Sequence, residues 1–257
     1  ANLLPGVGHF NDGYRDAIKG NIFLHDQRGF IGGGIGFERN IRAGVAGGIF
    51  YELGQGQYAQ EPQQCVNFVE CHDNHTLWDK IIICSPDETD EQRRAMHRLA
   101  SAIVLTSQGI PLLHAGQEFM RTKNGVENSY KSPVEINWMD WERCAAHGDS
   151  IAYMKQLISL RKAHPAFRLR SGDDIRDRLI FEKAPDHTVA YTLRDHAGGD
   201  SAQHLYVLYN AAPQEISLAL PELGDWKVIF GADFVSKVEK DKLTVRGIGM
   251  VVLAVHS

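Results

Sequence analysis

The sequence has 257 residues, of which 43% are hydrophobic, and a formal net charge of −5. These values predict a packed globular protein of one large domain or two ordinary ones. The acidic balance, with no basic stripe, argues against a nucleic-acid partner. No apolar run is long enough to cross a bilayer, and the start lacks the pattern of a secretion signal, so we expect no membrane partner either.

The four cysteines show no close CxxC pairing. Cys65 and Cys71 share a face of one predicted strand but lie too far apart to bond. Together with Cys84 and Cys144 they are expected to be free, mostly buried thiols. This pattern favours a reducing, cytoplasmic compartment over secretion.

The chain opens with a predicted strand over residues 7–10, and residues 11–20 (NDGYRDAIKG) form the loop after it. The glycines at 32–36 lack the Gly-Lys-Ser/Thr ending of a phosphate loop and predict a connection. A helix is expected from Glu38 to Ala46.

The apolar run from Cys65 to Cys71 predicts a buried strand of a parallel sheet, with His72 and Asp73 at its carboxyl end. In barrels of alternating strands and helices, such positions carry the chemistry. The alternative is a solvated turn. A metal site from Glu70, His72, Asp73 and His75 is not expected, because side chains alternate along a strand and the spacing fits no zinc motif.

Thr89 and Gln92 form a predicted capping box at the start of an amphipathic helix, which Gly109 and Pro111 end. Residues 110–114 then predict a further strand, which completes a parallel crossover. A second helix is expected around residues 151–162. From about residue 173 the pattern changes to short strands separated by turns, which predicts an antiparallel sandwich. The predicted strands cover 179–182, 188–194, 205–210, 216–220, 226–230, 242–245 and 250–255.

Several strings resemble one family. They are HDNHTLWDK from His72, SQGIPLLHAGQEFMRTK from Ser107, NSYKSPVEINWMDW from Asn128 and LRKAHPAFR from Leu160. Together with FND and RDAIKG near the start, they are similar to the type I pullulanases of glycoside hydrolase family 13, in the alpha-amylase clan. The resemblance implies hydrolysis of alpha-1,6-glucosidic links with retention, on a (β/α)8 barrel followed by a C-terminal β domain.

The resemblance covers only the last part of that barrel. A complete barrel takes ~250 residues, whereas about 170 precede the predicted sandwich. We therefore expect residues 1–172 to hold about strands 6 to 8, and residues 173–257 the sandwich. The GFRFD-type motif of the nucleophile is absent, and no strand-end Glu precedes Val7. The chain alone is predicted to be inactive, with the N-terminal part of the same enzyme as its partner.

The resemblance assigns Asp73 as the transition-state-stabilising carboxylate, and His72 as a donor to the same sugar. The implied ligands are alpha-glucans: pullulan, starch, glycogen and limit dextrin. No cofactor is expected; calcium occurs in the clan, but no loop here compels it. Further substrate-binding candidates are Asn74, Trp78, Asn128, Tyr130, Asn137, Arg15 and Asp16. Arg15 and Asp16 could instead form a surface ion pair.

Two alternatives remain open. The chain could be a non-catalytic alpha-glucan-binding or interaction fragment, which the missing nucleophile favours. It could also belong to a glycogen-debranching, isoamylase-like enzyme. A barrel fragment leaves two free edges, so we also expect uncovered apolar faces at Val66, Phe68 and Leu112, and hence self-association.

Overall fold

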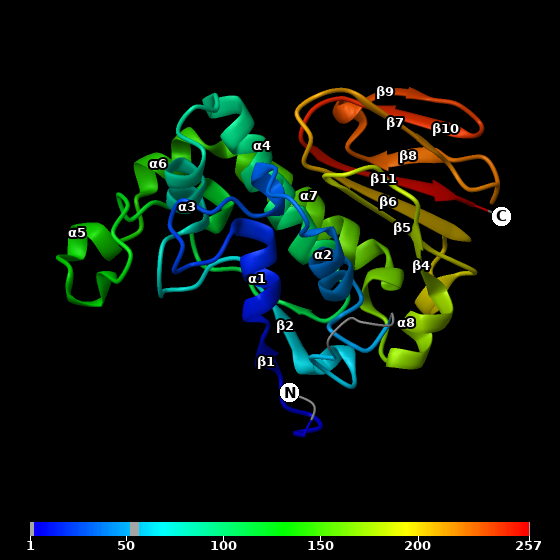
Figure 1. The fold of residues 1–257 in the computed structure, drawn as a ribbon, viewed down its shortest axis with the longest axis horizontal. Helices are drawn as coiled ribbons and strands as arrows, with labels where there is room; N and C mark the ends of the chain where they lie inside the picture. The colour runs from blue at the N-terminus through cyan, green and yellow to red at the C-terminus, as the bar shows by residue number, and fades with distance from the viewer. Residues whose placement is uncertain (1–2, 52–56, 257) are drawn as a thin grey trace.

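The computed structural model describes residues 3–51 and 57–256. A short parallel sheet and its helices come first along the chain, and two antiparallel sheets follow (Figure 1). Within the described residues, no helix combines the length and apolarity needed to cross a membrane.

The parallel sheet has the order β1-β2-β3. Its strands are β1 (His9–Phe10), β2 (Cys65–Asn67) and β3 (Ile110–Pro111). The predicted parallel pairing is confirmed, with Phe10 opposite Val66 and Val66 opposite Ile110. The predicted strand lengths were wrong. Because β1 and β3 end at the level of β2, residues 68–71 find no ladder partner among the described strands and leave the sheet as a mostly buried irregular segment.

The longer helices match their sequence patterns. Thr89 Oγ1 accepts a hydrogen bond from the Gln92 N–H at 3.2 Å, and Gln92 Oε1 accepts from the Thr89 N–H at 2.9 Å, which confirms the capping box. The helices predicted near residues 38–46 and 151–162 are also present. The set is α1 (Asp12–Lys19), α2 (Glu38–Val45), α3 (Leu77–Cys84), α4 (Asp90–Thr106), α5 (Val134–Asn137), α6 (Trp141–Ala146), α7 (Gly148–Ala163) and α8 (Gly172–Arg178).

The antiparallel part holds a five-stranded sheet of order β4-β5-β6-β11-β8 and a three-stranded sheet of order β7-β10-β9. All seven predicted strands are present, within one residue at each end. The sequence analysis missed β9, whose four residues VSKV alternate weakly, and the helices α3, α5, α6 and α8. It was also wrong about residues 11–20, which were expected to form a loop but contain the helix α1. The strands are β4 (Leu179–Glu182), β5 (Thr188–Leu193), β6 (His204–Asn210), β7 (Ile216–Ala219), β8 (Lys227–Phe230), β9 (Val235–Val238), β10 (Lys242–Val245) and β11 (Gly249–Val255).

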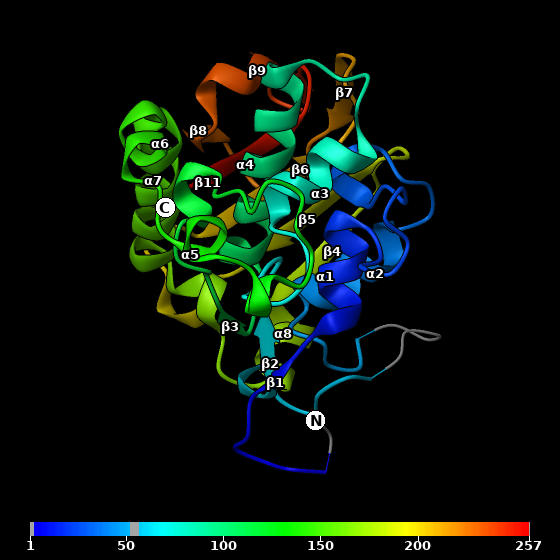
Figure 2. The same cartoon turned by 90° about the vertical axis from the view of Figure 1, so that its left-hand side faces the viewer.

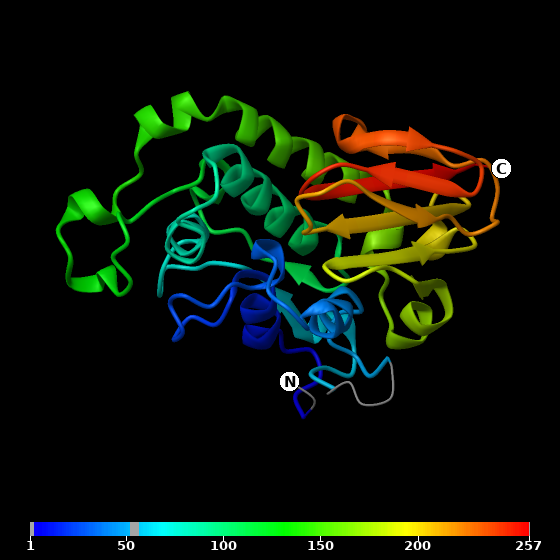
Figure 3. The ribbon, with the colours of Figure 1, turned by 45° about the horizontal axis from the view of Figure 1, so that its top comes forward.

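The five-stranded sheet is buried on both faces. Along β6, Val207 and Tyr209 belong to the core cluster shared with the helices, whereas Tyr206 and Leu208 pack with the three-stranded sheet. Strand side chains alternate between faces, so the middle layer contributes to two cores. Figure 3 shows α7 running from the α5 end of the molecule toward these sheets. Figure 2 looks along the molecule from the α5 end, with the sheets behind the helices.

The apolar faces expected to be uncovered are only partly so. Phe68 is buried, because the Phe10 ring packs edge-on at 4.9 Å between centroids and the Arg15 guanidinium lies 5.4 Å from its ring. The prediction for Phe68 was therefore wrong, while Val66 and Leu112 are partly buried. Around the parallel sheet the exposed apolar side chains are Leu3, Leu4, Val7, Phe10, Ile110 and Leu113.

Candidate functional site

The carboxyl ends of β1, β2 and β3 meet at one edge of the parallel sheet. Buried polar side chains link the neighbouring strands. Asn11 Nδ2 donates to Cys65 Sγ at 3.2 Å, and Asn67 Nδ2 donates to the Gln108 carbonyl at 2.7 Å. These bonds hold the residue after β1 against the start of β2, and the end of β2 against the segment that enters β3.

His72 and Asp73 lie on an exposed turn beyond this edge, but β2 ends at Asn67, so they do not follow directly on the strand as the sequence analysis expected. Their side chains are 86% and 67% exposed, and His72 Nε2 lies 3.4 Å from Asp73 Oδ1. Asn74 follows with a φ of 58°, in the left-handed region that Asn tolerates better than most residues. The Asp73 carboxylate is thus presented to solvent, where it can accept hydrogen bonds from a ligand.

Glu70 lies buried below the turn. Its Oε1 is 3.2 Å from His114 Nδ1, and its Oε2 accepts from the Leu77 N–H at the start of α3. Burial alone would raise the pKa of this carboxyl, but the hydrogen bonds from His114 and Leu77 hold it below its ordinary value. Glu70 is therefore a charged anchor that ties β2, β3 and α3 together.

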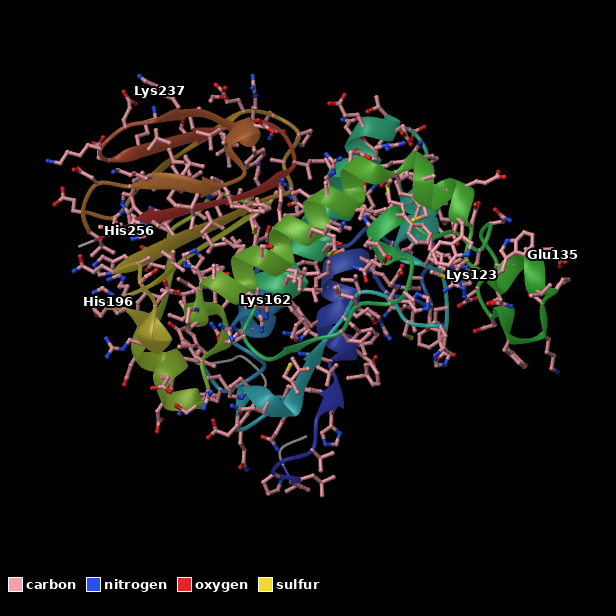
Figure 4. The ribbon with its side chains drawn as sticks, turned by 180° about the vertical axis from the view of Figure 1, so that it is seen from behind. Lys123, Glu135, Lys162, His196, Lys237 and His256 are labelled. Atoms are coloured by element: carbon pink, nitrogen blue, oxygen red, sulfur yellow. The ribbon has the colours of Figure 1, made fainter. Side chains whose placement is uncertain are left out.

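A buried lysine holds the other side of the turn. Lys123 Nζ donates to the carbonyls of His72 at 3.3 Å and Asn74 at 2.5 Å, on both sides of Asp73. Asp79 on α3 in turn accepts the Lys123 N–H at 2.8 Å. Burial lowers the pKa of the Lys123 ammonium. Residues 124–141, which include α5, form a segment that extends from the body of the molecule (Figure 1) and is called the protrusion below. Figure 4 labels Lys123 near its inner end and Glu135 on α5 at its outer end.

Sequence reasoning missed Glu70, Lys123 and Asp79 as supports of the turn. One signal was present: Asp79 and Lys80 stand in the otherwise apolar run LWDKIII, and charged residues there need buried partners. Lys123 and His114 gave no such signal, because their partners lie far away in the sequence.

The remaining predicted residues fall into three groups. Asn128 and Tyr130 are exposed on the protrusion, Tyr130 by 81%. Trp78 is buried, with its ring 6.3 Å from that of His97 and Arg143 lying 5.7 Å from its face. Asn137 lies in the protrusion and bonds Ser129, with its Nδ2 2.7 Å from the backbone carbonyl. Trp78 and Asn137 are thus engaged within the protein.

Arg15 and Asp16 lie on α1. Arg15 Nε is 2.8 Å from Asp16 Oδ1, and its Nη1 is 2.7 Å from Asp12 Oδ1. Arg15 is nearly buried, since its guanidinium also lies over Phe68. The pair therefore braces α1 against the segment that follows β2.

The four residues of the rejected metal alternative point in different directions. Glu70 bonds His114, His75 Nε2 is 3.2 Å from the Gly125 carbonyl, and His72 and Asp73 face solvent. All four cysteines are free; Cys65 and Cys84 are buried, and Cys71 and Cys144 are partly buried.

Known proteins resemble this chain along its whole length. A pullulanase from Bacillus subtilis (strain 168) is 40% identical over 260 residues, spanning 100% of this chain and 36% of the relative. A solved mutant pullulanase from Paenibacillus barengoltzii, complexed with maltotetraose, is 67% identical with a TM-score of 0.98, covering 99% of this chain and 39% of that one. The family model for the pullulanase all-beta domain matches residues 175–233. The chain belongs to the pullulanase family.

The matched part is the C-terminal region of pullulanases, with its helices and antiparallel sheets. The chain therefore spans little more than a third of the length of these relatives. An isoamylase from Flavobacterium sp is 29% identical over 67% of this chain and 28% of its own length. Pullulanases and isoamylases are debranching glycoside hydrolases.

Proposed function

We propose that this chain is part of a debranching hydrolase that cleaves alpha-1,6-glucosidic links in pullulan, starch, glycogen or limit dextrin with retention. The observation that carries the proposal is Asp73, presented to solvent on the turn beyond the carboxyl end of β2 in a chain 40% identical to a pullulanase. The 29% identity to an isoamylase makes the glycogen-debranching alternative weaker.

In this proposal residues 1–172 supply about strands 6 to 8 of a (β/α)8 barrel, and residues 173–257 form a β-sandwich domain. The parallel order β1-β2-β3, with α3 and α4 between β2 and β3, supports the barrel. The start of the all-beta family match at residue 175 supports the boundary. The other barrel strands would come from the N-terminal part of the enzyme.

Asp73 would act as a transition-state stabiliser. Retaining hydrolysis uses a nucleophile and an acid/base about 5 Å apart, and in this proposal both come from the N-terminal part. An ionised Asp73 accepts short hydrogen bonds from two vicinal hydroxyls of the sugar. Its negative charge then stabilises the positive charge that develops on the ring in the transition state. His72, 3.4 Å away, would donate to the same sugar.

The other candidates take different parts in the proposal. Asn74 in the turn, with Asn128 and Tyr130 on the protrusion, would contact the glucan directly because they are accessible or partly so. The other four candidates would shape the site without contacting the glucan, because their side chains already contact other residues of the protein. They are Trp78, Asn137, Arg15 and Asp16.

The test is reconstitution. The 257-residue chain is purified alone and also together with the N-terminal part of the enzyme, and reducing sugar released from pullulan is measured. We expect no release by the chain alone, and release by the pair. Asp73→Asn should abolish the release, whereas Asp241→Asn, an exposed residue beside β10, should leave it unchanged. Pullulan hydrolysis by the chain alone that is lost in Asp73→Asn would refute the division of roles.

A second candidate is a non-catalytic glucan-binding role. The protrusion exposes the aromatic side chains of Tyr130, Trp138 and Trp141, which can stack on sugar rings. Affinity electrophoresis of the chain in gels containing pullulan distinguishes the two. Retardation that persists in Asp73→Asn, with no activity on reconstitution, would favour the binding role.

A further inference from the structure

Three side chains of metal-ligating type gather from three separate loops: His25, His75 and Glu127. One ligand atom from each lies within 4.8 Å of the others. His25 Nε2 is 3.5 Å from Glu127 Oε2, and the two imidazole rings stand perpendicular with centroids 5.0 Å apart. Because the residues are about 50 positions apart in the chain, no sequence spacing announces the cluster.

We infer that this cluster is a binding site for a zinc-class divalent cation. Two imidazoles and a carboxylate form a zinc ligand set that leaves one position open. At zinc–ligand distances of about 2.0–2.1 Å, tetrahedral ligand atoms lie ~3.3 Å apart. The His25–Glu127 pair, at 3.5 Å, already has this separation. The ligand atoms of every pair lie within 4.8 Å, so the widest pair must close by no more than ~1.5 Å. Rotation of the half-exposed His25 side chain can supply this movement.

His75 is set for ligation by a neighbouring carbonyl. Its Nε2 lies 3.2 Å from the Gly125 carbonyl oxygen, and the residue is buried. In the tautomer that donates from Nε2 to this oxygen, Nδ1 keeps its lone pair. Histidines that ligate metals are commonly oriented by such a bond from their other nitrogen.

The backbone of each ligand residue is held by a buried lysine. Lys80 Nζ donates to the His25 carbonyl at 3.0 Å, and also to those of Asn21 and Leu24. Lys19 Nζ donates to the His75 carbonyl at 3.2 Å, and Lys123 Nζ donates to the Glu127 carbonyl at 2.9 Å. The three loops are therefore fixed before a metal arrives, so only side-chain rotation remains to be ordered on binding.

The nearby charges set the affinity of the site for a cation, and the ligand types set its selectivity. The ammonium groups of these lysines oppose a cation, and Glu127 is the single acidic residue of the cluster. We therefore expect a dissociation constant on the order of micromolar, weaker than that of structural zinc sites. Calcium and magnesium prefer shells made of oxygen ligands, so neither should compete.

A bound zinc ion would clamp the turn that carries Asp73, because His75 lies two residues beyond it and the other ligands come from loops on either side. Zinc binding is measured on the chain itself and does not depend on the proposed hydrolase function. A failed zinc titration would leave that function intact.

The experiment is a zinc titration of the chelator-treated 257-residue chain by isothermal calorimetry, with Co²⁺ absorption as a second readout. The variants are His25→Gln and Glu127→Gln, both at accessible side chains where folding should be unaffected. The matched control is His256→Gln, at an exposed histidine near the C-terminus. Circular dichroism confirms that each variant is folded.

We expect one equivalent of zinc in the parent chain and in His256→Gln. Loss of a ligand should weaken binding at least ~100-fold, since even changes to the groups that orient ligands cost 10–100-fold. The visible Co²⁺ band should be lost from both site variants, and Ca²⁺ should produce no heat. Zinc binding that is absent from the parent chain, or retained in both folded site variants, overturns the inference.

Discussion

Replacing Glu70 by Gln tests whether the buried carboxylate anchors the site. In the structure its two oxygens meet His114 Nδ1 and the Leu77 N–H. Hydrogen bonds to a charged group contribute about 1.5–3 kcal/mol each, against about 0.5–1.5 kcal/mol for neutral ones. Losing the charge at both bonds should therefore lower the free energy of unfolding by ~2–3 kcal/mol.

The direction of the pKa shift of Glu70 determines how this stabilisation depends on pH. The pKa of Glu70 is lowered in the folded protein, so the folded state favours the ionised carboxyl. Its contribution is fully present above the ordinary Glu pKa and is lost as the pH falls through the lower folded value. The difference in the free energy of unfolding between the parent chain and Glu70→Gln should therefore be largest at neutral pH and decrease in acid.

The assay is urea unfolding of the chain at low concentration, followed by tryptophan fluorescence at neutral and at acid pH. Glu222→Gln serves as the matched control, because Glu222 is exposed in a loop. A loss smaller than ~0.5 kcal/mol, which is within the range of an ordinary surface substitution, would refute the anchoring role. If the difference in the free energy of unfolding stayed the same at acid pH, the stabilisation could not come from the negative charge of Glu70.

Three further predictions use other parts of the chain. In the complete enzyme, Asp73→Asn should lower kcat at least ~100-fold, as removal of one electrostatic stabiliser does; near-normal kcat in steady-state assays would make the turn merely structural. Thr89→Ala should cost about 1 kcal/mol through loss of the α4 cap, whereas Thr89→Ser should restore it; equal urea midpoints for the two would contradict this. The chain alone should self-associate through the apolar side chains near Phe10 and Ile110; a single monomer in sedimentation at micromolar concentration would contradict it.

Local signals predicted much of the fold. Thr89 and Gln92 fixed the start of α4, because a capping box is written within four residues. The antiparallel strands were also readable, since short runs of strand-forming residues separated by turn residues are local signals. The ends of β2 were not readable, because they depend on where β1 and β3 stop. β9 was missed because its pairing with β10, not its composition, makes it a strand.

In the candidate site, too, the residues with a local sequence signal were predicted and those that depend on distant partners were not. His72 and Asp73 could be placed beyond the carboxyl end of a parallel strand from one continuous string, although β2 ends five residues before His72 rather than directly before it. Their supports could not be, because Glu70 finds His114 across 44 positions and Lys123 reaches back 51 to His72. Burial of a charged side chain is decided by long-range packing, so a single sequence shows the charge but not its partner.

The five-stranded sheet and α7 hold the backbone of the segment that leads into β3. Tyr191 Oη on β5 donates to the Thr106 carbonyl at 2.9 Å, at the last residue of α4. Arg161 on α7 donates to the Ser107 and Gly109 carbonyls, both at 2.8 Å. The strand that leads to His114 thus starts from a backbone held by residues far downstream. Changes in the tyrosines of β5 and β6, remote from any sugar, should alter the position of His114 and through Glu70 that of the turn carrying Asp73.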